Sequence, residues 1–146
     1  MSVSDIDEAP LPEGELSIRV IAMQYDTHSH GDIFAGWLVS KMDLAAGISA
    51  GKTANGRVIT ITINGMQFLT AVHIGAVVSC YTNITEIGRS SVKIHVEAWI
   101  THEKASTRSK ATEGEFIFVA IDDSRRTRTI SQSSQSAQRY KSLALM

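Results

Sequence analysis

The sequence predicts an α+β domain in which an antiparallel sheet packs against one long helix. Residues 33–50 repeat apolar side chains at helical spacing, whereas the stretches before and after them are β-branched or alternate between apolar and polar residues. The stretches after the helix follow one another through turns, with no repeat of a parallel βαβ unit. The predicted order is therefore one strand, one helix and then a run of antiparallel strands.

The elements follow in chain order. A short strand is expected over residues 16–22, and a loop over residues 23–32 ends at Asp32, a residue type that caps helix N-termini. The helix over 33–50 is closed by glycines at 51 and 56. Further strands are expected over residues 57–63, 77–86, 91–101 and 115–121.

One of these strands alternates without interruption. In residues 91–101, five apolar side chains are expected on one face of the sheet: Val92, Ile94, Val96, Ala98 and Ile100. The opposite face then carries Lys93, His95, Glu97 and Trp99. Such alternation is typical of an antiparallel sheet with one face on the core.

The predicted helix carries very little charge. Between residues 33 and 50 only Lys41 and Asp43 are charged, so the helix is expected to be buried nearly all round, with a second subunit covering part of it. A buried carboxylate needs a partner. Two interpretations of Asp43 stay open: a local role, as a cap or in a pair with Lys41 or Arg57, or a general base. The first-turn N–H groups near Gly36 are candidate oxyanion donors.

Length and composition limit the classes of function. The chain has 146 residues, 43% of them hydrophobic, with 14 Lys and Arg against 15 Asp and Glu. This fits one domain and argues against general nucleic-acid binding. A lone cysteine, Cys80, excludes an internal disulfide. We expect a cytoplasmic protein, since neither a signal peptide nor an apolar run of about 20 residues is present.

Charge divides the chain into three parts. Residues 1–15 are acidic and are expected to form a flexible leader, and residues 16–123 are the nearly neutral folded domain. Residues 124–146 are basic and rich in Ser and Gln, which predicts a tail that is mobile or partly helical. The alternative is that this basic segment lies near an anionic ligand.

Ligand-type side chains alternate in the loop before the helix. His28 and His30, with a neighbouring carboxylate, leave a metal site open as an alternative. Two histidines at this spacing are more often ordinary hydrogen-bonding residues. We therefore expect no metal.

The same region carries a family resemblance. The pattern Asp26-Thr27-x-x-x-Gly31-Asp32-Ile33-Phe34-x-Gly36-Trp37-Leu38, followed by Met42-Asp43, resembles the hotdog-fold acyl-CoA thioesterases of the YciA type. The resemblance continues through residues 56–60, 65–69, 88–99 and 110–118. It spans roughly residues 16–123. It implies a hotdog fold, in which a sheet wraps a central helix and dimers share one continuous sheet, usually three dimers to a hexamer.

The resemblance also implies a site between subunits that hydrolyses acyl-CoA without a metal or redox cofactor. Asp43 corresponds to the catalytic acid, which acts as base for water or, less often, as nucleophile. The facing subunit supplies His28 and the N–H groups near Gly36 and Trp37. The resemblance places CoA at Gly88, Arg89, Ser90 and Ser91, with Arg57, Arg108 and Lys110 as further candidates for the phosphates. The acyl chain is expected along the apolar helix face, near Phe34, Trp37 and Met42.

Two departures from the family pattern leave alternatives open. His28 stands where family members commonly have Asn, and Ala76 stands where an Asp is usual. One alternative is a non-catalytic acyl-CoA-binding or sensor protein. Another is a hydratase that acts on enoyl or hydroxyacyl thioesters with His30 and Asp43 as an acid–base pair.

Overall fold

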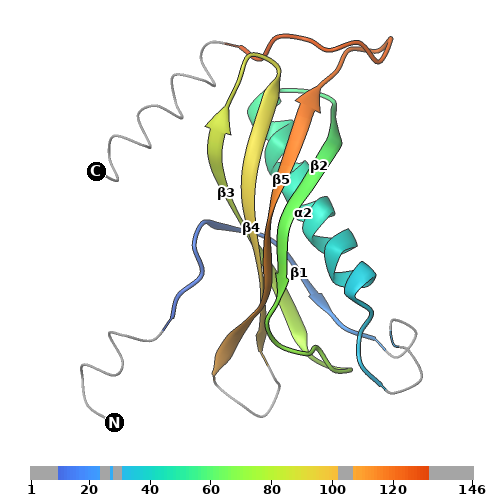
Figure 1. Cartoon of the computed structure of the whole chain (residues 1–146), viewed down its shortest axis with the longest axis vertical. Coiled ribbons are helices and arrows are strands. Elements are labelled where there is room, and N and C mark those ends of the chain that lie inside the picture. The colour runs from blue at the N-terminus through green and yellow to red at the C-terminus, as the bar shows by residue number, and fades with distance from the viewer. Residues whose placement is uncertain (1–9, 24–26, 28–30, 102–106, 132–146) are drawn as a thin grey trace.

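The computed structural model describes residues 10–23, 27, 31–101 and 107–131. Its elements are β1 (Glu15–Ile21), α2 (Ala35–Ala54), β2 (Val58–Phe68), β3 (Val77–Ile87), β4 (Ser91–Thr101) and β5 (Arg108–Ala120). The strands form one antiparallel sheet in the order β1-β3-β4-β5-β2, which curves around α2 (Figure 1). The predicted α+β hotdog architecture is confirmed.

Element boundaries differ from the sequence prediction at four places. Two are ends: α2 continues through Gly51 to Ala54, past the predicted end at residue 50, and β2 continues to Phe68, past the predicted end at residue 63. The helix begins at Ala35, and Phe34 is its N-cap without a side-chain cap bond, so the expected cap by Asp32 is wrong. The Asp32 carboxylate instead pairs with His73 at 2.8 Å. The last strand, β5, begins at Arg108 and not at residue 115. The prediction missed its first half because polar side chains there, such as the hydrogen-bonded Lys110 and Glu113, show no apolar alternation.

The core lies between the helix and the inner face of the sheet. Small and flexible helix residues let α2 approach the strands closely, and they are fully buried: Met42, Ala45, Ala46 and Ala50. The strands contribute the apolar set predicted for β4, together with Phe116 and Phe118 of β5. This contact fixes the face of α2 that points into the sheet.

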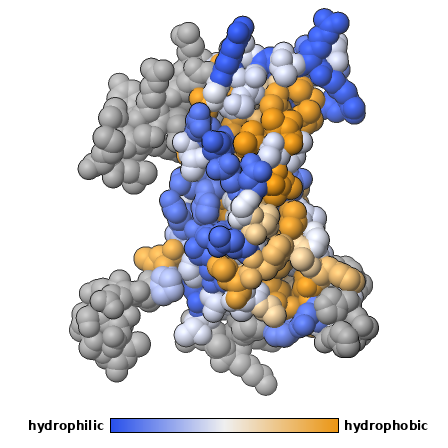
Figure 2. All heavy atoms as spheres, viewed as in Figure 1, coloured by the Kyte–Doolittle hydropathy of each residue, from blue (hydrophilic) through white to orange (hydrophobic). Residues whose placement is uncertain are grey.

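The other side of the helix and one sheet edge stay uncovered in the single chain. Leu44 of α2 is 53% exposed, and Ile59 and Ile61 of β2 are 44% and 54% exposed. Figure 2 shows hydrophobic side chains gathered along the side of the molecule where β2 forms the edge. The expectation that one curved sheet cannot cover the helix on all sides therefore agrees with the structure.

Strand β2 is irregular as well as exposed. Its pairing with β5 shifts register between Thr60 and Thr62 and again between Asn64 and Gln67. Gly65, at the second shift, has a φ of 61° that favours glycine. These two bulges change which side chains of β2 face the helix.

The segment after β5 belongs to the folded unit as far as the described residues extend. Ile130 is fully buried, and its N–H donates to the carbonyl of Arg89 at 2.7 Å. The Arg128 guanidinium donates to the carbonyl of Ala54, the last helical residue, at 2.8 Å. Residues 124–131 are thus attached to the domain through Arg128 and Ile130, whereas the rest of the predicted tail lies outside the described residues.

Among the described residues, no helix is both long and apolar enough to cross a membrane.

Candidate active site

Asp43 lies in the middle of α2 and is half-buried between the helix and β2. The Thr60 hydroxyl donates a hydrogen bond to Asp43 Oδ1 at 2.6 Å. Within the described part of the chain Asp43 makes no ion pair, and the Lys41 ammonium lies 5.6 Å from the centroid of the Trp37 ring instead. The local pairing of Asp43 with Lys41 or Arg57 is therefore not what the structure shows. A hydroxyl holds one carboxylate oxygen and leaves the other available.

Thr60 is a site residue that the sequence did not reveal. A threonine in a β-branched strand is what strand propensity favours in any case. Its alternation with Ile59 and Ile61 gives the opposite signal, because apolar residues are expected to face the core, whereas both isoleucines are exposed and Thr60 faces the helix.

The start of α2 offers an open approach to its backbone. Gly36 is exposed, and a Cβ placed there would meet no heavy atom within 4 Å. The helix provides no acceptor for its first-turn N–H groups. The Trp37 N–H already donates a hydrogen bond to the Phe34 carbonyl at 3.1 Å. Gly36 is therefore the better placed of the two predicted oxyanion donors.

Asp43 and Gly36 of one chain lie too far apart to act on the same carbonyl group. Seven residues of helix separate them by about 10 Å at 1.5 Å per residue. A site that uses both groups must therefore combine Asp43 of one chain with Gly36 of another.

The candidate substrate-contacting residues fall into different environments. Phe34 is 49% exposed and Trp37 is half-buried, but Met42 is fully buried in the core, away from any surface of the single chain. A cavity of about 260 Å³ opens between the start of α2 and the end of β2. Its walls are mostly apolar: Ile33, Ala35, Leu38, Phe68, Leu69 and Val72.

The basic candidates separate into two groups at opposite ends of the sheet. Gly88, Arg89 and Ser90 form the turn between β3 and β4, and Ser91 begins β4. The segment after β5 links this turn to Arg57. The Ile121 N–H donates to the Arg57 carbonyl, and the Ile130 N–H donates to the Arg89 carbonyl. The structure therefore brings Arg57 and Gly88–Ser91 to one end.

Arg108 and Lys110 lie at the other end of the sheet. Arg108 pairs with Thr101 at the far end of β4, on the order of 30 Å from Ser91. The Lys110 ammonium pairs with Glu113 at 2.7 Å and with Glu97 at 3.5 Å. The hydrogen bond with Glu113 is the largest influence on Lys110, and it raises the pKa of the ammonium. These two residues therefore cannot share a ligand group with Arg89 of the same chain.

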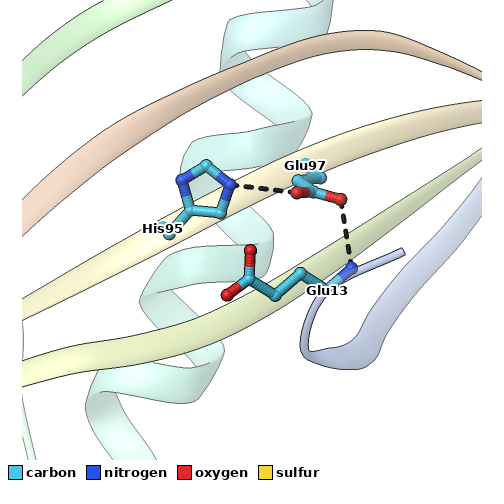
Figure 3. A group of neighbouring side chains, drawn as sticks. All are labelled: Glu13, His95 and Glu97. Atoms are coloured by element: carbon cyan, nitrogen blue, oxygen red, sulfur yellow. Dashed lines mark hydrogen bonds and ion pairs between the residues drawn. The ribbon is translucent and has the colours of Figure 1, made fainter. Parts of the chain in front are cut away.

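The outer face of β4 holds a compact group of titratable side chains (Figure 3). The ligand-type atoms of Glu13, His95 and Glu97 lie within 4.8 Å of one another. Glu97 is buried, and its carboxylate accepts hydrogen bonds from the Trp99 indole at 2.8 Å and the Glu13 N–H at 3.1 Å. Burial alone raises the pKa of Glu97, but these donors, with His95 and Lys110, hold it below its ordinary value.

This arrangement fits an ion-pair network better than a metal site. The Lys110 ammonium already supplies a positive charge beside the Glu97 carboxylate, and both oxygens of that carboxylate have partners. The other metal alternative concerned His28 and His30, which lie outside the described residues.

Residues 30–106 match the family described as the Thioesterase superfamily. The chain is 46% identical over 114 residues to the acyl-CoA thioester hydrolase YciA of Salmonella typhimurium, covering 76% of this chain and 86% of that protein. It is 42% identical over 123 residues to YciA of Escherichia coli K12, covering 82% and 93%.

Solved structures agree with the sequence matches. HI0827, a hexameric broad-specificity acyl-coenzyme A thioesterase solved as its Asp44Ala mutant, superimposes with a TM-score of 0.83 at 39% identity, covering 91% of this chain and 97% of that one. The hexameric thioesterase y2039 of Yersinia pestis gives 0.81 at 43% identity, covering 84% and 100%. The chain therefore belongs to the thioesterase superfamily and, within it, to the family of YciA acyl-CoA thioester hydrolases. The resemblance stated from the sequence is confirmed.

Proposed function

We propose that this protein hydrolyses acyl-CoA thioesters to a carboxylic acid and CoA, with Asp43 as general base. The observation that carries the proposal is the half-buried Asp43 carboxylate, held on one oxygen by Thr60. Its relatives of the YciA family are named acyl-CoA thioester hydrolases, which supports the same substrate class.

The proposed reaction needs only water and the protein's own groups. Asp43 takes a proton from water as the water oxygen bonds to the thioester carbonyl carbon. The tetrahedral intermediate then collapses, the carbon–sulfur bond breaks, and the CoA sulfur leaves with the proton that Asp43 took from water. No metal or redox cofactor enters this scheme.

The second half of the site is proposed to come from another copy of the chain. Pairing of the exposed β2 edges would continue the sheet and cover Ile59, Ile61 and Leu44. It would also set Gly36 of one chain opposite Asp43 of the next, so that its N–H stabilises the oxyanion. HI0827 and y2039 are hexameric, which supports a trimer of such dimers.

We assign the other candidates by their positions. The apolar cavity at the start of α2 would take the acyl chain beside Phe34 and Trp37. Arg57 and the turn Gly88–Ser91 would take the phosphates of CoA. His28 would be a hydrogen-bond donor to the substrate in place of the usual Asn. We also propose a cytoplasmic location, where acyl-CoA is available.

The test is release of CoA thiol from acyl-CoAs ranging from acetyl to palmitoyl. Asp43→Asn keeps the size of the side chain but removes the base, so kcat should fall by about 10²–10⁴-fold. Glu15→Gln makes the same acid-to-amide change at an exposed residue of β1, the strand at the opposite edge of the sheet from β2, and should leave kcat unchanged.

Other outcomes identify the alternatives. Near-normal kcat in Asp43→Asn would contradict the role of Asp43. Tight binding of acyl-CoA by wild type without thiol release would support the sensor interpretation. Loss of enoyl-CoA absorbance without thiol release would support a hydratase.

A further inference from the structure

Exposed arginines gather at the end of the molecule where α2 and β5 finish. We call Arg57, Arg89, Arg125 and Arg126 the arginine end; all four are exposed. Figure 2 shows hydrophilic side chains projecting from the end that holds the β3–β4 turn and the segment after β5 in Figure 1. Arg128 is excluded from the group because its guanidinium is bound to main-chain carbonyls.

The turn that carries Arg125 and Arg126 is firmly built. The Arg125 N–H donates to the Asp122 carbonyl at 3.0 Å, and the Asp122 N–H donates to the Arg126 carbonyl at 2.8 Å. Asp122 Oδ1 also accepts from the N–H groups of Ser124 and Arg126. The side chain of Asp122 is therefore occupied inside the turn. With Asp123 it places two carboxylates near the four arginines, which leaves a positive excess at this end.

The same turn is attached to the other two members of the arginine end. Ile121, just before the turn, donates to the Arg57 carbonyl at 3.0 Å, and Ile130, just after it, donates to the Arg89 carbonyl at 2.7 Å. Four guanidinium groups are thus presented from backbone that is tied together.

The backbone at Arg125 gives a second, independent observation. Its φ is 63°, in the left-handed region that glycine occupies at no steric cost. Three-residue hairpin loops place glycine at this position. An arginine there keeps a positive charge at the price of backbone strain, which points to a role for that charge.

We propose that Arg125 and Arg126, together with Arg89 and Arg57, bind the 3′-phosphate and diphosphate of the CoA nucleotide. The inference rests on the proposed function and extends it to residues after β5. One guanidinium group can donate two parallel hydrogen bonds to the oxygens of one phosphate, and this nucleotide carries three phosphates close together.

The register of the sheet supports this direction for CoA. Thr60, the partner of Asp43, pairs with Phe118, and Phe118 pairs with Val92. Asp43 therefore lies level with Val92 at the start of β4. Val92 is three residues from Arg89, which corresponds to about 10 Å along an extended chain. Arg108 and Lys110 lie at the far end of β4.

The experiment compares two substrates that differ only in the nucleotide. An acyl-CoA that wild type hydrolyses and the S-acyl-pantetheine with the same acyl group are tested on Arg125→Gly, Arg126→Gln and the double variant. Glycine suits the positive φ, so Arg125→Gly should not lower Tm. KM for acyl-CoA should rise about tenfold or more in the double variant, with kcat unchanged. KM for S-acyl-pantetheine should not change.

Controls make the result specific. Arg19→Gln removes an exposed arginine on β1, the opposite edge of the sheet, and should leave both KM values unchanged. Arg126→Lys should restore part of the affinity that Arg126→Gln loses. Unchanged KM in the double variant, or an equal rise for both substrates, would overturn the proposal. So would a larger effect of Arg108→Gln.

Calorimetry separates this inference from the proposed function. CoA and dephospho-CoA, which lacks the 3′-phosphate, are titrated into wild type and the double variant. If wild type binds CoA but releases no thiol from acyl-CoA, the proposed hydrolysis is wrong. Weaker CoA binding by the double variant then still supports phosphate binding by the arginine end. Equal binding by both proteins, or no binding by wild type, overturns it.

Discussion

Arg128 and Gly56 together give a sharp test of how the helix end is held. The Arg128 guanidinium donates to the carbonyls of Ala54 at 2.8 Å, Ile121 at 3.0 Å and Arg57 at 3.4 Å. It therefore ties the C-terminus of α2 to the start of β2 and to the segment after β5. A cation also interacts favourably with the negative end of the helix dipole.

Replacing Arg128 with Met keeps most of the aliphatic stem and removes these donors. A hydrogen bond from a charged group contributes about 1.5–3 kcal/mol, and two of the three here are short. Because Arg128 is half-exposed and water can replace part of the loss, we expect the free energy of unfolding to fall by about 2–3 kcal/mol. For a chain of this length Tm should drop by roughly 5–10 °C.

Gly56 makes the reasoning refutable through a double-mutant cycle. A Cβ at Gly56 would lie 2.6 Å from Arg128 Nη2, so Gly56→Ala must displace the guanidinium. Its φ of 155° adds backbone strain that is the same in both backgrounds. In urea unfolding, Gly56→Ala should therefore cost at least about 1 kcal/mol less when Arg128 is already Met. Additive effects, within about 0.5 kcal/mol, would refute the contact.

Three further outcomes are expected. Thr60→Val removes the hydroxyl on Asp43 Oδ1 and should lower kcat about tenfold with little change in KM; an unchanged kcat would contradict its positioning role. Burial raises the pKa of the Cys80 thiol to about 12, so a chromogenic thiol reagent should modify it only after unfolding. The lowered pKa of Glu97 contributes stability above the ordinary glutamate pKa, and that stability is lost as pH falls below it. Glu97→Gln should therefore make Tm fall less steeply with decreasing pH than in wild type. The same steepness in both proteins would contradict this role of Glu97.

The regular parts of the fold could be predicted because burial of one face of a strand or helix requires apolar residues at a regular spacing in the sequence. Strand β4 spans residues 91–101 as predicted, since its inner side chains alternate strictly and are all buried. The start of β5 was missed for the opposite reason. Lys110 forms ion pairs with both Glu113 and Glu97 on the outer face, and these polar side chains leave no regular apolar spacing to detect.

The candidate site could be predicted only where one residue was anomalous by itself. Asp43 is conspicuous as an acid in an apolar helix, and the resemblance gave it a role. Thr60 is an ordinary strand residue until the helix is docked against it. The separation of Arg108 from Arg89 likewise depends on the direction of β4 and β5, which composition and spacing do not encode.

The two bulges of β2 have a consequence for how a newly made chain finds its partner. An apolar edge strand of 11 residues invites other chains to extend the sheet without limit. Bulges between Thr60 and Thr62 and between Asn64 and Gln67 interrupt the regular row of main-chain donors and acceptors. Slipped alignments of two copies then lose hydrogen bonds. The opposite edge, β1, has seven residues and a shift of its own, so open-ended growth toward fibres is discouraged from both sides.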